Sequence, residues 1–380
     1  MSAHDVIVIG GGIIGGSIAW ELARRGARPL ILERETQAQE ASWAAAGMLQ
    51  PAPDSAEVIP LVPLARASLA MYPQFVCAIE EDSGRKVHLR RHGAIEAMFS
   101  ADAERELSTL IALHHGLGLS AEPLPIEDAL ALEPALNPNV CAAMLMPDEA
   151  AVDNRALSAA AMEAARNRGA EFRGDVEVVS LGIRGGRVEH VVARDGNRFS
   201  AAQIVLAAGC YSSLIEDAAR YAPTRPVRGQ MVALRSSAPK LTRVMRSPHG
   251  YISPRNDAPQ QWLICGSTVE HAGYEKRVTP GGLSRVLDSA QELIPALSGA
   301  EIVETWCGLR PDTPDHLPIL GPTDVEGLLI ATGHFRSGIL LAPITAKLMG
   351  EWILDRSVSF DWEIFSPMRF AALSRSAGRG

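Results

Sequence analysis

The chain has 380 residues, which at roughly 100 to 200 residues per domain predicts two domains or one large composite domain. Hydrophobic residues make up 47% of the sequence and charged residues 21%, which excludes wholesale disorder and a fibrous repeat. The 36 basic and 44 acidic side chains give a net charge of −8, so there is no general electrostatic attraction to nucleic acid or to an anionic membrane. We therefore expect a small molecule as the main partner.

The sequence gives no signal for membrane insertion, secretion or metal binding. Its longest uncharged stretch, from Val6 to Trp20, falls short of the roughly 20 apolar residues of a spanning helix. No Lys or Arg precedes it, unlike the start of a signal peptide. The 5 cysteines form no C-x-x-C pair, which predicts neither a disulfide framework nor a zinc site. We expect a cytoplasmic protein without a bound metal, and we leave a homo-oligomer open.

The first 33 residues carry the strongest pattern in the chain. A β-branched run at 5–9, a helix-length segment at 13–25 and an apolar run at 28–33 predict a βαβ unit. Prolines at 51, 53, 60, 63 and 73 predict a crossing into another structural unit. Residues 101–118 predict a helix, and the prolines from 123 to 147 predict a long irregular stretch.

The second half of the chain alternates between helical and strand patterns. Asp153 is typical of a helix cap and predicts a helix over 154–168. Glycine turns around apolar runs at 176–183 and 187–193 predict an antiparallel meander, which leads to a buried strand at 203–207. Further strands are expected at 231–234, 251–253 and 262–265, and further helices at 283–293 and 339–354.

A glycine-rich loop follows the first strand and opens the first helix. Gly10, Gly12 and Gly15 satisfy G-x-G-x-x-G, which permits a tight turn, a close approach of the backbone to a phosphate and close helix packing. Glu33 ends the second strand, where an acid binds both ribose hydroxyls. The pattern predicts a dinucleotide, and the loop alone does not separate NAD from FAD. A P-loop is disfavoured because its lysine is missing, and a hydrolase elbow because Ser17 would lie inside the helix.

The strand end IVLAAG at 204–209, together with the N-terminal loop, resembles the D-amino-acid oxidase-like FAD-dependent oxidoreductase superfamily, and within it the glycine oxidases of the thiamine pathway. Three further segments are similar to glycine oxidase, whereas no matching motif occurs from about residue 50 to residue 145. These segments are ASWAAAGML at 41–49, GLRPDTPDHLPILG at 308–321 and GHFRSGILLAP at 333–343.

The resemblance implies an α/β fold with two interleaved domains. One is a Rossmann-like FAD-binding domain of the D-amino-acid oxidase type with a β-meander, and the other is an α+β substrate domain built on a mainly antiparallel sheet. We expect the FAD-binding domain at 1–75, 150–225 and 305–370, the substrate-binding domain at 76–149 and 226–304, and a C-terminal tail at 371–380.

The resemblance also implies FAD as the cofactor and indicates which residues contact it. The small residues of 41–48 suit a backbone that lies against a flat flavin ring. The turn at 333–338 opens an apolar helix, whose first N–H groups would stabilise the negative charge of a reduced flavin. Val176 lies where the family contacts adenine through its backbone. The expected cofactor-binding residues are Gly10, Gly12, Ile13, Ile14, Gly15, Glu33, Arg34, Ala41, Ser42, Ala46, Gly47, Met48, Val176, Ala208, Gly209, His334, Phe335, Arg336, Ser337, Gly338, Ile339 and Leu340.

A carboxylate site is implied as well. In the family, the arginine that matches Arg310 grips the substrate carboxylate, and the arginine that matches Arg336 lies near it. A guanidinium group suits this role because it binds a planar carboxylate through two parallel hydrogen bonds. Tyr251 resembles a tyrosine that helps to hold the carboxylate, and His249 is expected at the pocket entrance. Met48, in the segment that passes the flavin ring, completes the expected catalytic residues.

The activity implied by the resemblance is oxidative deamination of a small amino acid, namely glycine, sarcosine or a small D-amino acid. Hydride transfer to flavin N5 and reoxidation by dioxygen would give a 2-oxo acid, ammonia and hydrogen peroxide; glycine would give glyoxylate. Three alternatives stay open: a sarcosine oxidase-like enzyme with its flavin attached through Cys307, a D-amino-acid dehydrogenase with a membrane acceptor, and a flavin-binding protein without turnover.

Overall fold

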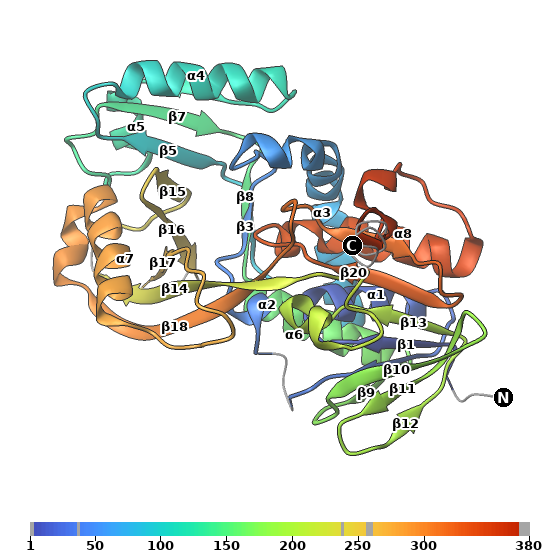
Figure 1. Ribbon diagram of the computed structural model, residues 1–380. Helices are drawn as coiled ribbons and strands as arrows, with labels where there is room; N and C mark the ends of the chain where they lie inside the picture. The colour runs from blue at the N-terminus through green and yellow to red at the C-terminus, as the bar shows by residue number, and fades with distance from the viewer. Residues whose placement is uncertain (1–3, 36–38, 237–238, 256–260, 372–380) are drawn as a thin grey trace, which may run out of the picture.

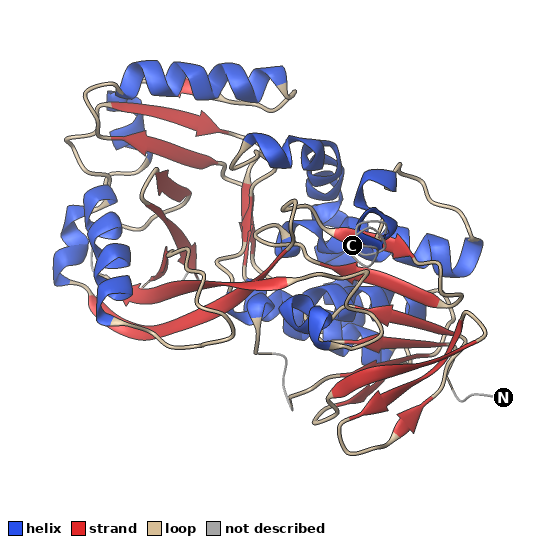
Figure 2. Cartoon of the chain, in the orientation of Figure 1, coloured by secondary structure: helices blue, strands red, loops and turns tan. Residues whose placement is uncertain are grey.

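The computed structural model describes residues 4–35, 39–236, 239–255 and 261–371, which form two adjoining regions, each built on a large sheet (Figure 1). Figure 2 shows the two sheets in red, with helices packed beside both of them. Two long strands, β14 (Arg225–Arg235) and β18 (Glu301–Asp312), run from the second region toward the first. Most of the expected C-terminal tail lies outside the described residues.

The first sheet combines strands from the beginning, the middle and the end of the chain. Its order is β19-β20-β13-β1-β2-β9, and only the β19–β20 pair is antiparallel. The predicted βαβ start is confirmed, since β1 and β2 are parallel neighbours joined by a helix. The strands are β1 (Val6–Ile9), β2 (Pro29–Leu32), β9 (Glu171–Arg173), β13 (Gln203–Leu206), β19 (Ile319–Pro322) and β20 (Leu328–Thr332).

The two faces of this sheet are covered differently. Because side chains alternate along a strand, Val6 and Val8 of β1 pack in the helix-side core, whereas Ile7 and Ile9 pack in the core beneath the meander. The helix layer contains α1 (Ile13–Arg24), α3 (Val62–Ser83), α6 (Asn154–Asn167) and α8 (Gly338–Asp355). The meander contains β10 (Val178–Arg184), β11 (Arg187–Ala193) and β12 (Arg198–Phe199), as predicted.

The second sheet has eight strands in the order β18-β14-β17-β16-β15-β5-β7-β6. All its pairs are antiparallel except β15–β5. Its other strands are β5 (Ala94–Met98), β6 (Glu122–Leu124), β7 (Ala142–Met146), β15 (Val244–Ser247), β16 (Gly250–Arg255) and β17 (Trp262–Gly266), and its helices are α4 (Ala103–Gly116), α5 (Ile126–Leu132) and α7 (Pro280–Leu293). The expected mixed α/β fold with a mainly antiparallel second sheet is confirmed.

Small elements connect the two regions near the site. A short sheet of order β3-β8-β4 stands between them (Figure 1). The elements are α2 (Ala41–Ala44), β3 (Met48–Leu49), β4 (Leu89–Arg90), β8 (Ala150–Val152) and the 3-10 helices Ala56–Leu61 and Gly209–Leu214. Two further 3-10 helices, Pro295–Gly299 and Glu363–Phe365, pack beside α7 and β19.

Helix α3 crosses the domain boundary that we expected after residue 75. Its Val76 is buried in the same core as α1. Ser68 and Tyr72 donate hydrogen bonds to the carbonyl oxygens of Leu340 (2.6 Å) and Ile339 (2.5 Å) on α8. Among the described residues, 56–83 is the one segment that is long and apolar enough to cross a membrane. In this structure α3 packs against α6 and α8.

The prediction of irregular structure between residues 123 and 147 is wrong, because this stretch contains most of β6 and all of α5 and β7. Its prolines lie mainly at the edges of these elements: Pro125 precedes the first turn of α5 and Pro147 follows β7. Proline is tolerated at such positions because its missing N–H group is not needed there. Strand β5 was not predicted, although it lies inside the eight-stranded sheet, between β15 and β7.

Candidate functional site

A cavity of about 610 Å³ lies between the two large sheets. Its walls are the loops that follow β1, β13 and β20, the segment from residue 41 to residue 54, and residues of the eight-stranded sheet. This is where open α/β folds bind ligands, outside the carboxyl ends of parallel strands. Of the residues that we expected at the site, all line the cavity except Gly15, Arg34 and Val176.

The glycine loop can form only without side chains at two positions. Gly10 has φ of +106°, and a Cβ atom there would lie 2.5 Å from the carbonyl oxygen of Ala207. A Cβ atom on Gly15 would lie 1.9 Å from the carbonyl oxygen of Gly10. Gly15 therefore keeps helix α1 close to the loop without itself lining the cavity, and the backbone of the loop stays open to a ligand.

Glu33 joins the glycine loop to the end of β2. Its carboxylate accepts a hydrogen bond from the backbone N–H of Gly11 at 2.6 Å, and it is buried. Burial raises the pKa of Glu33, and the hydrogen bond from Gly11 opposes this rise. Its place at the cavity wall, next to the loop, suits the binding of a ribose.

Two expected adenosine contacts lie outside the cavity wall. The backbone N–H of Val176 donates to the carbonyl oxygen of Glu33 at 2.9 Å, so this donor is already engaged. The guanidinium group of Arg34 lies 3.8 Å from the ring centre of Tyr211 and bonds to Glu40 at 2.5 Å. Arg34 thus flanks the nucleotide end of the cavity without lining it.

The segment from Ala41 to Met48 is held in place by side chains that the sequence did not reveal. Asn154 donates to the carbonyl oxygen of Ser42 at 2.6 Å, and Trp306 donates to that of Ala44 at 3.0 Å. The buried Arg255 donates to the carbonyl oxygen of Ala46 at 3.0 Å. These donors come from α6, β18 and β16, whose spacing in the sequence gives no sign that they meet.

Close packing also restricts the size of the residues in this segment. A Cβ atom on Gly308 would lie 2.5 Å from that of Ala44, and one on Gly47 would lie 2.0 Å from the carbonyl oxygen of Val152. The small residues therefore allow the segment to pass between β18 and β8, and its other side lines the cavity.

The start of α8 offers backbone donors to the cavity. Gly338, Ile339 and Leu340 line it, and among the described residues no side chain caps this helix. The first N–H groups of a helix have no acceptor within the helix, and the positive end of its dipole attracts an anion. The preceding loop is fixed by a hydrogen bond from the N–H of Phe335 to the carbonyl oxygen of Pro311 at 2.9 Å.

His334 contributes no charge to this wall. It is buried, its Nε2 atom lies 3.1 Å from Oγ1 of Thr345, and burial lowers its pKa to about 3. The imidazole is therefore neutral near pH 7. The charge available to an anion at this wall comes from the helix start and from arginine side chains.

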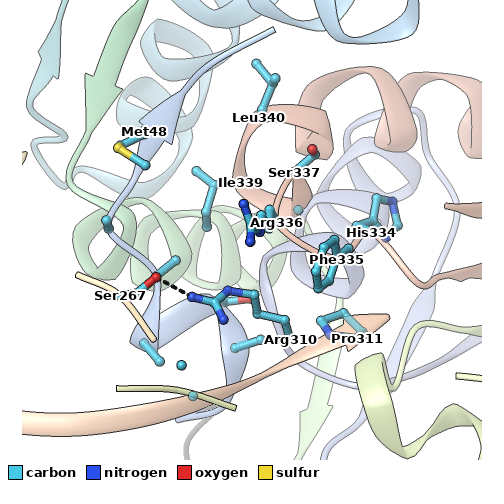
Figure 3. Close-up of a pocket in the computed structure, with 18 of the residues that line it drawn as sticks. Met48, Ser267, Arg310, Pro311, His334, Phe335, Arg336, Ser337, Ile339 and Leu340 are labelled. Carbon is cyan, nitrogen blue, oxygen red and sulfur yellow. Dashed lines mark hydrogen bonds between the residues drawn. The ribbon is translucent and has the colours of Figure 1, made fainter. Parts of the chain in front are cut away.

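Arg310 extends from β18 into the cavity (Figure 3). Its Nη2 atom donates to Oγ of Ser267 at 2.6 Å and its Nη1 atom to the carbonyl oxygen of Thr268 at 3.1 Å. Burial lowers its pKa from the usual arginine range. Among the described residues, no carboxylate forms an ion pair with Arg310. It is thus a desolvated cation whose acceptors here are all neutral.

Gly229 makes room for this guanidinium group and was missed by the sequence analysis. A Cβ atom on Gly229 would lie 2.4 Å from Nη2 of Arg310. The arginine therefore lies directly over a glycine on the neighbouring strand β14. No local motif marks Gly229, because the requirement comes from a side chain 81 positions away in the chain.

Tyr251 lines the cavity from β16, and a glycine makes room for its side chain as Gly229 does for Arg310. Its hydroxyl group lies 3.3 Å from Sδ of Met231, and a Cβ atom on the intervening Gly266 would lie 2.6 Å from both atoms. His249 lines the same end, but its side chain is 69% exposed and its Nδ1 atom lies 2.9 Å from Glu292. This position agrees with the expected place at an entrance.

Arg336 reaches the cavity from the loop before α8, which lies beside the end of β18 (Figure 3). Unlike Arg310, it has an acidic partner: its Nη1 atom lies 2.9 Å from Oδ2 of Asp54, and both side chains are partly exposed. Met48 lines the wall from β3. The structure therefore brings all five expected catalytic residues to one cavity and distinguishes a paired arginine from an unpaired one.

The cavity fits FAD. It joins a loop that needs glycine, a buried acid at the end of β2, a wall of small residues and an uncapped helix start. These features suit, in turn, a pyrophosphate, a ribose, a flat ring and the negative charge of a reduced ring. Among the described residues, no group of three or more His, Cys, Asp or Glu side chains could hold a metal ion.

Comparisons with known proteins agree with this fit. A family described as DAO, FAD dependent oxidoreductase, matches residues 5–352. The chain is 34% identical to glycine oxidase from Geobacillus kaustophilus, over 96% of this chain and 97% of that protein. It is 36% identical to the bifunctional protein ThiO/ThiG of Synechocystis over 97% of this chain, but it spans only 54% of that protein's length.

Solved structures give the same result. The crystal structure of glycine oxidase from Geobacillus kaustophilus matches with a TM-score of 0.90 and 32% identity, covering 96% of this chain and 98% of that one. Iminodiacetate oxidase from Chelativorans matches with a TM-score of 0.86 and 26% identity, covering 95% and 98%. The chain therefore belongs to the DAO family of FAD-dependent oxidoreductases, and its cofactor is FAD.

Proposed function

We propose that this FAD-dependent enzyme oxidises a small amino acid, with glycine, sarcosine and small D-amino acids as candidate substrates. The products are the 2-oxo acid, which is glyoxylate for glycine, together with ammonia and hydrogen peroxide. The name of the glycine oxidase that covers almost the whole chain supports this choice. A role in thiamine biosynthesis, supported by the ThiO/ThiG relative, and a cytoplasmic location are part of the same proposal.

The unpaired guanidinium group of Arg310 carries the proposal. A largely desolvated cation is costly unless an anion pairs with it, and the hydrogen bonds of Arg310 reach only a hydroxyl and a carbonyl oxygen. A substrate carboxylate would supply the missing charge and could accept two parallel hydrogen bonds from the guanidinium group. Tyr251 lines the same cavity and would help to hold the same carboxylate.

The residues of this chain act mainly by positioning the substrate. Arg310 and Tyr251 fix the carboxylate, and the cavity walls shield Cα from water. The flavin, when bound, would supply the electron sink: its N5 atom would accept the hydride from Cα, and dioxygen would take up the electron pair with protons as hydrogen peroxide. The resulting imine is hydrolysed by water to the oxo acid and ammonia.

Non-covalent binding of FAD is favoured over attachment through Cys307. On β18 the side-chain positions alternate, so Gly308 and Arg310 face the cavity and Cys307 faces away from it. Burial also raises the pKa of the Cys307 thiol, which lowers the thiolate fraction. Acid precipitation of the purified protein tests this directly, because a non-covalent flavin stays in the supernatant.

A peroxide-coupled panel of amines on purified yellow protein tests the proposed activity. We expect hydrogen peroxide to form with glycine, sarcosine or a small D-amino acid, in amounts equal to the substrate oxidised. Substrate oxidation with an artificial acceptor but without peroxide would instead support a dehydrogenase. If none of these amines reduces the flavin, the proposal is wrong and a binding function without turnover gains support.

A further inference from the structure

A row of side chains crosses the cavity-facing side of the eight-stranded sheet and continues beyond Tyr251. The strand register places Arg246 of β15 opposite Tyr251 of β16 and next to Glu96 of β5. Residues opposite each other on neighbouring strands point to the same face of a sheet, with Cβ atoms about 5 Å apart. Glu96, Arg246 and Tyr251 also line the same cavity. The substrate end therefore continues into a charged wall.

This wall contains more acid than base. Arg246 Nε bonds to Glu96 at 3.0 Å, and its Nη1 atom lies 3.0 Å from Glu149, which stands behind the wall. The side chain of Arg246 is only 8% exposed, and its charge is compensated by these two carboxylates. Asp54 also lies in their surroundings but is paired with Arg336, and the neighbouring His114 is kept neutral because burial lowers its pKa. The cluster is neutral when one of its two glutamates is protonated and negative when both are ionised.

Glu96 is the member of the cluster that faces a ligand. Its Oε2 atom accepts the hydrogen bond from Arg246, and no hydrogen bond from the described residues reaches its Oε1 atom. The side chain remains 14% exposed and lines the cavity, unlike that of Glu149. The wall therefore presents one carboxylate oxygen with free acceptor capacity, fixed in direction by a buried arginine.

We propose that Glu96 forms a subsite for a second amino group on the substrate. Arg310 would bind the carboxylate, as in the proposed function on which this inference rests, and Glu96 would bind an ammonium group carried on a short extension from the reacting nitrogen or from Cα. A second substrate carboxylate in the same place would be repelled by Glu96. Arg246 would not offset this repulsion, because it is already paired with Glu96 and Glu149. The wall thus favours diamino substrates over dicarboxylic ones.

Three N-substituted glycines test this without a question of stereochemistry. They are sarcosine, N-(2-aminoethyl)glycine and iminodiacetate, which end in a neutral, a cationic and an anionic group. Anaerobic stopped-flow mixing with the holoenzyme gives an apparent Kd for each compound. It comes from the concentration dependence of the rate of flavin reduction when the compound is oxidised, and from the perturbed spectrum of the oxidised flavin when it is not. We expect the cationic compound to bind about tenfold more tightly than iminodiacetate.

The Glu96→Gln variant should reduce this preference about tenfold, because it removes the charge and keeps the size of the side chain. Glu96→Asp keeps the charge and should keep most of the preference. Glu122→Gln is the matched control, since Glu122 is exposed on β6 and does not line the cavity, and it should behave as the native protein does. Flavin content and thermal unfolding of each variant verify that it is folded.

An equal or reversed preference in the native protein would overturn the subsite, as would a preference that survives in Glu96→Gln. Because an apparent Kd is obtained whether or not the compound reduces the flavin, the outcome does not depend on turnover. A charge preference without oxidation of any compound would leave the subsite standing and refute the proposed oxidase activity. Oxidation of glycine without a charge preference would do the reverse.

Discussion

The two ends of the cavity are built in different ways. At the nucleotide end the ligand meets backbone: a glycine loop, a segment of small residues and the start of α8. At the substrate end it meets side chains of the eight-stranded sheet that are oriented by partners distant in sequence, as Ser267, which follows β17, orients Arg310. The first end depends on the absence of side chains, and the second on the matching of side chains that are far apart in sequence.

This difference predicts how each end fails. Changes at the nucleotide end should abolish flavin binding, because a backbone path cannot adjust to a new side chain. Changes at the substrate end should leave the flavin bound and alter only the affinity for the amino acid and its orientation.

The largest effect is expected from Gly15→Ala, because its Cβ atom would lie 1.9 Å from the carbonyl oxygen of Gly10. We expect this variant to be purified without flavin or to fail to fold. The adjacent Gly16→Ala is the matched control, since its Cβ atom would have no neighbour closer than 3.6 Å. The ratio of flavin to protein measures both, and a yellow Gly15→Ala protein would refute our account of the loop.

Replacing Arg310 with lysine should lower kcat/KM by about a hundredfold or more while the flavin stays bound. Lysine cannot provide two parallel hydrogen bonds, and each bond to a charged group is worth about 1.5–3 kcal/mol. Arg336→Lys should cost less than about tenfold, because Arg336 is already paired with Asp54 and partly exposed. Steady-state kinetics with glycine or sarcosine compare the two, and equal losses would contradict the distinction between them.

A smaller effect is expected from Gly229→Ala, which would force the Arg310 guanidinium group to move. We expect KM to rise about tenfold with little change in flavin content, because the carboxylate site is displaced and remains intact. Gly281→Ala on α7 serves as the control, since nothing lies within 4 Å of its added Cβ atom. Unchanged kinetics in Gly229→Ala would show that Arg310 does not need its position over a glycine.

The smallest effect concerns stability and comes from Glu149. Burial raises its pKa to about 7, against the opposing charge of Arg246 and with the support of Glu96 and Asp54. Because the folded state holds this proton more tightly than the unfolded chain, its stabilising contribution is complete below the ordinary carboxyl pKa and is lost as pH rises through about 7.

Glu149→Gln should remove this part of the pH dependence. We expect the free energy of unfolding of the native protein to fall by about 1–3 kcal/mol relative to that of the variant between about pH 5 and about pH 8. Urea unfolding at the two pH values measures the difference. If both proteins show the same pH dependence, Glu149 does not titrate in this range.

The nucleotide end was largely predictable from sequence because its residues are local. Gly10, Gly12, Gly15 and Glu33 lie within one βαβ unit, and their spacing alone predicts a dinucleotide. The meander and the cap at Asp153 were also predicted and confirmed. The expected domain boundary, in contrast, falls within α3. It rested on a local proline pattern, which carries no information about the packing of Val76 in the same core as α1.

The substrate end could be predicted only in part. The resemblance located Arg310, Tyr251 and Arg336 but not what surrounds them. Gly229 and Arg255 have no local signature, since one matters through Arg310 and the other through the backbone of Ala46. Such requirements arise when strands distant in sequence become neighbours in a sheet.

The central claim is that the cavity binds FAD and an amino acid held by its carboxylate at Arg310. Anaerobic mixing of the purified yellow protein with glycine or sarcosine tests it most directly. We predict that the flavin is bleached in the native protein, and that in Arg310→Lys it remains bound but is reduced at least a hundredfold more slowly at low substrate concentration. Bleaching at the same rate in both proteins, or in neither, would contradict the account.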